Sequence, residues 1–400
     1  MSKLNIVDYF PFPRAKVVQQ EVSQKAQITF IRIEPDKRFK PRCHVCGEDG
    51  DGVHSMHSRY VRDLNVTSMS TWLDVSYRKV RCLKCIGVRA EQLTFCDASK
   101  RVTHRLARYI FELCKMLTVQ EVSEHLGLDK KTVKAIDLAG LEAAHGQTDY
   151  ANLSILAIDE IAVKKGHNYM TVVLDYISGR VVWVGEGRSK DTLDEFFSGM
   201  SAAEKAGIEA VAMDMWEPFI NRVKAHCPQA QIVFDLFHLV KAFGEVIDEV
   251  RRTEYAQATK AKKAVLKGSR YLLLKNDENL SDGQRDRLKE LLEMNATLSA
   301  VHILKDQLKA IYGETSRVAA KTALDQWCHM AENIQHPMMR KYIGRLRFFE
   351  YGIINHCDYP IGTSKLEGVN NKIKVIKRKA YGFHDEHYFS LKIIQAFSGN

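Results

Sequence analysis

The chain has 400 residues, more than one compact core usually holds, so we expect two or three domains. Lys and Arg (59) outnumber Asp and Glu (49), and the resulting net charge of +10 favours a polyanionic partner. The start, MSKLNIVDYFPFPRAK, lacks the apolar core of a signal peptide, and no apolar run approaches the roughly 20 residues of a membrane helix. We therefore expect a cytoplasmic chain without a membrane partner, whose nine cysteines are metal ligands or free thiols and not disulfides.

The first hundred residues contain a candidate zinc site. Residues 1–40 include the alternating stretch QITFIRIE and are expected to form a strand-bearing arm. Residues 41–98 contain two C-x₂-C knuckles, which together supply the four thiolates that a structural Zn²⁺ prefers. The strand-like residues 58–80 between the knuckles can form a hairpin. The expected ligands are Cys43, Cys46, Cys82 and Cys85, and the alternative ligands nearby are Cys96, His44, His54 and His57.

Residues 99–145 have the layout of a helix-turn-helix, with an ordinary helical hairpin as the alternative interpretation. Thr118 and Glu121 fit a capping box, Gly127 permits a tight turn, and Asp129 can cap the next helix. Polar and basic side chains then lie near the start of that helix, where a recognition helix contacts DNA. These candidate DNA contacts are Lys130, Lys131, Thr132 and Lys134.

Residues 146–240 change to a strand-rich pattern. We expect strands over 153–159, 168–176, 180–186, 208–214 and 231–235, and helices over 191–205 and 217–226. Asp159 and Asp214 then end the first and fourth strands. A carboxylate at the end of a buried strand is costly unless it is paired or binds a metal, although a simple turn residue is the alternative. This order matches an RNase H-like layer, in which these two strand ends lie side by side.

Other polar residues of this region are candidates of lower rank. Asp235 ends the fifth strand and His238 follows it, so both are expected to be auxiliary site residues; a helix cap and a packed histidine are the alternatives. Glu160 adjoins Asp159 but should point to the opposite face of the strand. Asp175 is interpreted as a turn residue before the Ser-Gly hairpin turn at 178–179.

Residues 241–350 are almost wholly helical in pattern, and one further helix is expected over 364–380, within the segment 351–400. Glu367 shares one face of that helix with cationic and amide side chains, and an apolar face suits packing on a sheet. The candidate DNA contacts on the helix are Asn371, Lys374, Lys377 and Arg378, and the apolar face comprises Val369, Ile373, Ile376 and Ala380. Mg²⁺ prefers a few carboxylates together with substrate oxygens.

Together these blocks resemble a bacterial DDE transposase of the ISL-three insertion-sequence family. The resemblance spans nearly the whole chain and is carried by the two knuckles, the helix-turn-helix, AIDEIAVKKGHNYMTVV, VAMDMWEPF, FDLFHLVK and EGVNNKIKVIKRKAYGF. It implies that Asp159, Asp214 and Glu367 are the catalytic triad and that the helical residues 241–350 are an insertion within an RNase H-like catalytic domain.

From the residues and the resemblance we expect an α+β/α/β multidomain chain with a zinc ribbon, a helix-turn-helix and an interrupted RNase H-like domain. The triad is expected to hold two Mg²⁺ ions (or Mn²⁺), to cut double-stranded DNA at terminal inverted repeats and to join the ends to target DNA. A homodimer or higher oligomer on DNA, associated with the bacterial nucleoid, is expected. The alternatives are a DNA-binding regulator without catalysis and a metal-dependent nuclease without strand joining.

Overall fold

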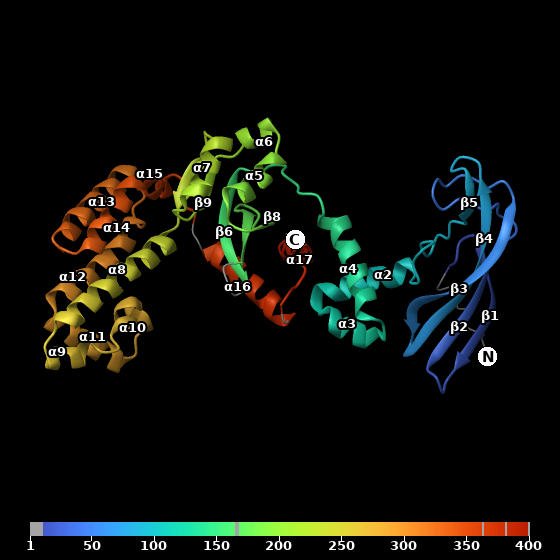
Figure 1. Ribbon diagram of the computed structural model, residues 1–400, viewed down its shortest axis with the longest axis horizontal. Coiled ribbons are helices and arrows are strands. Elements are labelled where there is room, and N and C mark those ends of the chain that lie inside the picture. The colour runs from blue at the N-terminus through green and yellow to red at the C-terminus, as the bar shows by residue number, and fades with distance from the viewer. Residues whose placement is uncertain (1–10, 165–167, 362–363, 381, 399–400) are drawn as a thin grey trace. The chain divides into compact units, whose positions relative to one another are not determined.

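The computed structural model describes residues 11–164, 168–361, 364–380 and 382–398. The chain divides into two compact units, Met1–Ala144 and His145–Asn400, and each is described by itself. Figure 1 labels their helices and strands.

The first unit begins with a five-stranded sheet. The strands are β1 (Ala15–Ser23), β2 (Ile28–Pro35), β3 (Val53–Val66), β4 (Met69–Cys82) and β5 (Gly87–Ala90). Their order is β1-β2-β4-β3, with β5 paired to β4, and only the β2–β4 pair is parallel. The expected hairpin over 58–80 is confirmed as β3 and β4, which turn at Thr67. The residues assigned to the arm and to the zinc module therefore share one sheet. Alternate strand residues fill its core, namely Ile31, Ile33, Val61, Leu73 and Val75.

Among the described residues, the sheet is followed by the helices α2 (His104–Met116), α3 (Val119–Leu126) and α4 (Lys130–His145), the last of which ends at the boundary of the unit. The expected capping box is confirmed, because Thr118 accepts from the backbone N–H of Glu121 and Glu121 accepts from that of Thr118. Gly127 has a φ of 61°, a left-handed conformation that glycine adopts without strain. Asp129 accepts from the backbone N–H of Thr132 at 3.1 Å, as a cap of α4 should.

A buried carboxylate joins the sheet of the first unit to its helices. Asp63 on β3 is 1% exposed and accepts hydrogen bonds from the hydroxyl of Thr103, at 2.6 Å, and from Nε of Arg105, at 2.7 Å. Thr103 is also the N-cap of α2. Asp63, through Thr103 and Arg105, therefore fixes the start of α2 against the end of β3.

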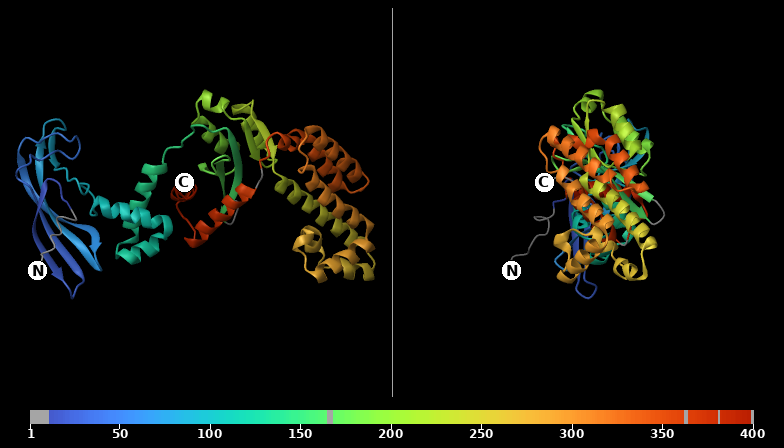
Figure 2. Two further views of the ribbon diagram at one scale, coloured as in Figure 1. Left: turned by 180° about the vertical axis from the view of Figure 1, so that it is seen from behind. Right: turned by 90° about the vertical axis from the view of Figure 1, so that its left-hand side faces the viewer.

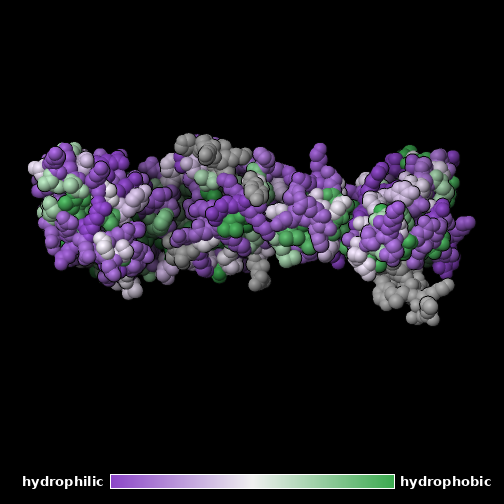
Figure 3. Space-filling view, turned by 90° about the horizontal axis from the view of Figure 1, so that it is seen from below, coloured by the Kyte–Doolittle hydropathy of each residue, from purple (hydrophilic) through white to green (hydrophobic). Residues whose placement is uncertain are grey.

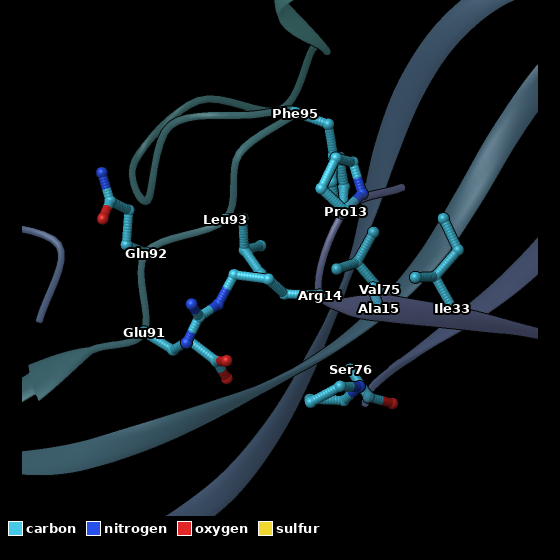
Figure 4. Close-up of a pocket in the computed structure, with 11 residues that line it drawn as sticks. Pro13, Arg14, Ala15, Ile33, Val75, Ser76, Glu91, Gln92, Leu93 and Phe95 are labelled. Atoms are coloured by element: carbon cyan, nitrogen blue, oxygen red, sulfur yellow. The ribbon is translucent and has the colours of Figure 1, made fainter. Parts of the chain in front are cut away.

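A pocket lies between the start of β1 and the segment that follows β5 (Figure 4). The carboxylate in its wall, Glu91, is already paired with the buried Arg78, whose Nε donates to it at 2.8 Å. The pocket contains none of the predicted site residues. Its lining is Pro13, Arg14, Ala15, Ile33, Pro35, Val75, Ser76, Glu91, Gln92, Leu93 and Phe95.

The second unit is built on another five-stranded sheet. Its strands are β6 (Ile155–Lys164), β7 (Asn168–Asp175), β8 (Val181–Glu186), β9 (Ala210–Met213) and β10 (Gln231–Phe234), in the order β10-β9-β6-β7-β8. β6, β9 and β10 are parallel, whereas β7 is antiparallel to both neighbours. The five predicted strands are confirmed, but the prediction that the first ends at Asp159 is wrong. β6 continues because its pairing with β7 extends to Lys164 opposite Asn168.

Helices cover both faces of this sheet. α5 (Lys190–Ser198) and α7 (Glu217–His226) pack on the face that contains Leu156 and Ile158. α16 (Ser364–Lys379) and α17 (Glu386–Ala396) pack on the face that contains Ala157 and Ile161. Figure 1 shows α16 running beside β6. The single helix expected over 191–205 is wrong, because Ser201 begins a new capping box and starts the short helix α6 (Ala202–Ala206).

The expected helical stretch is confirmed and is slightly longer than predicted. It runs through α8 (Leu236–Gln257), α9 (Lys260–Leu266), α10 (Arg270–Leu274), η1 (Asp277–Asn279), α11 (Asp282–Met294), α12 (Ala296–Ile311), α13 (Arg317–Glu332), α14 (Pro337–Phe348), α15 (Glu350–Ile354) and η2 (Asn355–Cys357). Figure 2 shows these helices gathered as a bundle. Aromatic rings of α8, α13 and α14 meet in its core, at Phe243, Trp327 and Tyr342.

In the described part of the chain, no helix is both long enough and apolar enough to cross a bilayer. The face drawn in Figure 3 is mostly hydrophilic, with small separate apolar patches.

The role of Asp63 leads to a first prediction. Asp63→Ala should destabilise the first unit by about 3 kcal/mol, because it removes the acceptor of the buried Thr103 hydroxyl and a charged partner of the half-buried Arg105. Hydrogen exchange of the α2 amides should become faster. The matched control is Asp97→Asn, which alters an exposed pair with His104 and should leave the exchange nearly unchanged. Equal exchange in the two variants would show that Asp63 does not hold α2.

Candidate functional site

Strand register brings Asp159 and Asp214 to the same place on the second sheet. β6 and β9 are parallel, and Ala157 lies opposite Ala212. Asp159 lies two residues further along β6, and Asp214 directly follows the last residue of β9, so the same register, continued, places them side by side. Ala157 and Ala212 both pack toward α16 and α17. Because side chains two residues apart share a face, both carboxylates point toward this same side.

Asp235 and His238 lie at the next strand end. The backbone N–H of Asp235 donates to the carbonyl of Met213 at 3.2 Å, directly before Asp214. The Asp235 carboxylate caps α8 by accepting from the backbone N–H of Phe237, and its second oxygen lies 3.1 Å from Nδ1 of His238. Asp235 is thus a helix cap, the alternative named from the sequence, and it also orients a histidine beside the strand ends.

The electrostatics of this edge show an excess of negative charge. Burial raises the pKa of Asp214, and the charge of Asp159 adds to this, while His238 opposes it. Burial likewise raises the pKa of Glu160 to about 7, together with the charge of Asp214, although Arg188 lies 3.6 Å from this carboxylate and opposes the shift. Burial works against a charged imidazole at His238, but the hydrogen bond that the imidazole donates to Asp235 and the charges of the surrounding carboxylates outweigh it and raise the pKa of His238.

The helix α16 covers this edge. Leu366, Val369 and Ile373 are buried against the sheet, and Ile376 is partly buried, so the predicted apolar face is confirmed apart from Ala380, which lies outside that cluster. Glu367 is exposed in the first turn of the helix. Among the described residues, Asp159, Asp214 and Glu367 do not form a group whose ligand atoms all lie within 4.8 Å of one another. The predicted cationic face is solvent-accessible: Asn371, Lys374 and Arg378 are exposed, and Lys377 is half-buried.

Two residues close to Asp159 were not selected from the sequence. The side-chain amide of Asn370, on α16, donates to Oδ2 of Asp159. Glu160 alternates with Asp159 along the strand, yet the charges of Asp214 and Asp159 both raise its pKa. The signal for Asn370 was its position three residues after Glu367, on the same side of the helix. The sequence could not show which of the two adjacent asparagines faces the sheet.

This edge fits a divalent cation. Oε1 of Glu160 and Oδ1 of Asn370 are buried oxygens without a hydrogen-bond partner. Such oxygens are rare in folded proteins, because burial removes their hydrogen bonds to water and no protein donor replaces them. The Asn370 oxygen lies on the α16 side of the sheet, beside the carboxylates of Asp159 and Asp214. Carboxylate and amide oxygens are the ligands that a hard cation such as Mg²⁺ prefers. Glu160 alternates with Asp159 along β6 and faces the opposite side of the sheet.

Beside Glu160, a guanidinium is held by two aromatic rings. Arg188 lies 4.4 Å from the ring centre of Tyr169 and 5.3 Å from that of Trp216, two residues after Asp214. Its charge partly offsets that of Glu160. Asp175, by contrast, is confirmed as a turn residue, since it accepts from the backbone N–H of Ile177 and from the hydroxyl of Ser178.

The four predicted cysteines gather at one end of the first sheet. The Sγ atoms of Cys46 and Cys82 are 3.5 Å apart, those of Cys43 and Cys85 are 4.0 Å apart, and all four lie within 4.8 Å of one another. Burial opposes ionisation of Cys43, but the backbone N–H groups of Cys46 and Val45 outweigh it and lower its pKa to about 7. The group can therefore hold a metal ion. Within the described residues, the alternative ligands Cys96, His44, His54 and His57 are not part of it.

One other group of potential ligands lies in the helical bundle, at Asp277, His302 and Asp306. Here Nζ of Lys309 already lies 3.1 Å from Asp306, which supplies a positive charge without a metal.

The predicted DNA contacts of the helix-turn-helix are accessible. Lys130, Lys131 and Thr132 are exposed in the first turn of α4, and Lys134 is half-buried. Val122, Leu126 and Val133 form the core behind them.

Comparison with known proteins identifies the family of the chain. Residues 156–393 match the ISL3 family model described as a transposase, and residues 91–139 match the helix-turn-helix domain of transposase family ISL3. The transposase for insertion sequence element IS1001 of Bordetella parapertussis is 40% identical over 361 residues, covering 90% of this chain and 89% of the relative. The transposase for insertion sequence element IS1557 of Mycobacterium tuberculosis is 26% identical over 377 residues, 88% of this chain and 84% of the relative. The chain belongs to the ISL3 family of transposases.

Proposed function

We propose that this chain is a DDE transposase that cuts DNA at the ends of an insertion sequence and joins those ends to target DNA. The observation that carries the proposal is the meeting of Asp159 and Asp214 at one sheet edge, beside a buried amide oxygen of Asn370 that lacks a donor, in a chain of a transposase family. In the strand order β10-β9-β6-β7-β8, the strand β7 is antiparallel to both of its neighbours, β6 and β8. This order supports the proposal of an RNase H-like catalytic layer.

We further propose that Asp159, Asp214 and Glu367 hold two Mg²⁺ ions, with Mn²⁺ as a substitute. When bound, such ions lower the pKa of an attacking water and stabilise the leaving oxygen. Glu367 is exposed on α16, so its approach to the two aspartates would accompany binding of metal and DNA. His238 is oriented by its hydrogen bond to Asp235, and its imidazole is suited to bind a phosphate or to transfer a proton at the same edge.

Two successive reactions at phosphorus would account for transposition. Hydrolysis breaks one P–O bond at the element end and leaves a 3′-OH and a 5′-phosphate. The 3′-OH then attacks a phosphodiester of the target, forming one P–O bond as another breaks, so no external energy source is needed. The exposed Lys374 and Arg378 beside Glu367 are placed to bind the phosphates of these strands.

The first unit would recognise the ends. We propose that the four cysteines bind one structural Zn²⁺ and that Lys130, Lys131, Thr132 and Lys134 contact the terminal inverted repeats. Holding two ends together calls for at least a homodimer on DNA, and such work would take place in the bacterial cytoplasm at the nucleoid. The helical bundle, an insertion between β10 and α16, carries exposed lysines that suit contact with flanking DNA or with a second subunit, among them Lys260, Lys262 and Lys267.

Experiment can distinguish the proposed transposase from two other functions. A DNA-binding regulator would use the first unit alone, so substitution of the acids would not alter its action. A nuclease would cut the ends without joining them, so joined products would be absent.

The zinc assignment gives a second prediction. Native protein should contain one Zn²⁺ per chain, with Zn–S distances of about 2.3 Å. Cys82→Ser should lose the metal and increase hydrogen exchange over 41–98, because the two knuckles would no longer be tied together. Cys357→Ser, outside the cluster, is the control and should retain the metal. A native protein without stoichiometric zinc by elemental analysis would refute the assignment.

The third prediction concerns the recognition helix. Lys131→Ala should weaken binding to terminal DNA, and the slope of log affinity against log salt should fall by about one, because one phosphate contact is lost. Binding measured at several salt concentrations tests this. Lys190→Ala, at the start of α5 and on the face of the second sheet opposite α16, is the charge-matched control. An unchanged affinity and slope for Lys131→Ala would remove α4 from the DNA contact surface.

The fourth prediction concerns catalysis. Asp159→Asn, Asp214→Asn and Glu367→Gln preserve size but remove charge from the metal site, so each should reduce cleavage and joining by on the order of 100-fold or more. Binding to end DNA should persist, because it depends mainly on the first unit. Glu195→Gln, an exposed residue of α5, should cleave like the native protein. Near-normal cleavage by any one acidic-site variant would exclude that residue as a ligand, and Asp235 would then be the first replacement to examine.

A further inference from the structure

We propose that Asn370 is a positioning residue for Asp159 and that its side-chain amide sets the affinity of this site for divalent metal. The inference rests on the proposed function, since it assumes that Asp159 is a metal ligand.

The contact between the two side chains has a defined direction. An ionised carboxylate only accepts hydrogen bonds, so the amide of Asn370 must present its NH₂ group to Oδ2 of Asp159. The other oxygen, Oδ1, accepts from the backbone N–H of Glu160 at 2.7 Å. Both carboxylate oxygens are therefore held, one from β6 itself and one from α16. These two hydrogen bonds fix the rotamer of the Asp159 side chain before a metal binds. Metal binding therefore does not have to restrict that side chain at an entropic cost.

The helix that carries Asn370 is itself well anchored. Val369 and Ile373 are buried against the sheet on either side of it, and Ile373 is fully buried. Asn370 thus lies at the rim of the packed face, and its contact with Asp159 joins parts of the chain that are 211 positions apart. Glu367, three residues earlier on the same side of α16, takes its position relative to Asp159 from this contact.

The carbonyl oxygen of the same amide indicates that a ligand binds beside it. Because the NH₂ group faces Asp159, Oδ1 of Asn370 points away from it, and this atom is buried without a hydrogen-bond partner. A buried amide oxygen normally has a donor. A divalent ion, or a water that the ion holds, would supply what this oxygen lacks, and amide oxygens are regular ligands of hard cations. Side chains that orient metal-binding carboxylates typically alter metal affinity by about 10–100-fold.

The test is the binding of Mn²⁺ to full-length protein without DNA, measured from the electron paramagnetic resonance signal of free Mn²⁺. Asn370→Ala and Asn370→Leu should each raise the Kd for Mn²⁺ by about 10–100-fold. The leucine variant keeps the branched shape of the side chain without its amide, so it separates loss of the amide from loss of packing. Asn371→Ala is the matched control: it is the adjacent, exposed asparagine of the same helix and should keep the native Kd. Thermal unfolding without metal checks that each variant is folded.

A second readout is the Mg²⁺ dependence of cleavage. The Asn370 variants should need more Mg²⁺ for half-maximal rate and should recover most of the native rate at saturation, because the amide acts through metal affinity. Native affinity in both variants, or weakened affinity in Asn370→Ala alone, would overturn the inference and leave the proposed function intact. Absence of any Mn²⁺ binding that depends on Asp159 in the native protein would instead overturn the proposed metal site, and this inference with it.

Discussion

The second unit depends on one constraint: carboxylates that share the edge of a buried sheet need a compensating positive charge. Asp214 and Glu160 both have raised pKa values because burial disfavours their charged forms. The nearby cations only partly relieve this, since Arg188 faces Glu160 and His238 faces Asp235. Such an arrangement lowers the stability of the metal-free protein and becomes favourable when a cation binds, which is how a binding site differs from an ordinary core.

The fold meets this constraint by separating the two faces of β6. Because alternate residues point to opposite faces, Asp159 faces α16 and Glu160 faces the side of α5 and α7. Parallel pairing with β9 then places Asp214 beside Asp159, and pairing of β10 with β9 adds Asp235. Register alone thus gathers three carboxylates from distant parts of the chain. The helix that covers these carboxylates, α16, follows the helical bundle in the sequence.

Much of this was predictable from the sequence because the signals are local. The capping box at Thr118, the turn at Gly127 and the cysteine knuckles depend on residues a few positions apart, and the structure has them as expected. The extent of β6 was not predictable, since it depends on pairing with β7 beyond Asp159. Asn370 was also missed. Periodicity gives the faces of a helix, but only tertiary packing shows which residue at the rim of the buried face meets Asp159.

The position of Glu367 connects these points. Glu367 lies in the first turn of α16, and the next turn of this helix contacts Asp159 through Asn370, yet the Glu367 side chain is exposed. An acid that remains in water avoids adding a further uncompensated charge to an edge where Glu160 and Asp214 already resist ionisation. The balance reverses once cations occupy the edge, because each bound ion then attracts the carboxylate. Exposure of Glu367 is therefore what electrostatics favours for the side chain that is proposed to join the metal site last.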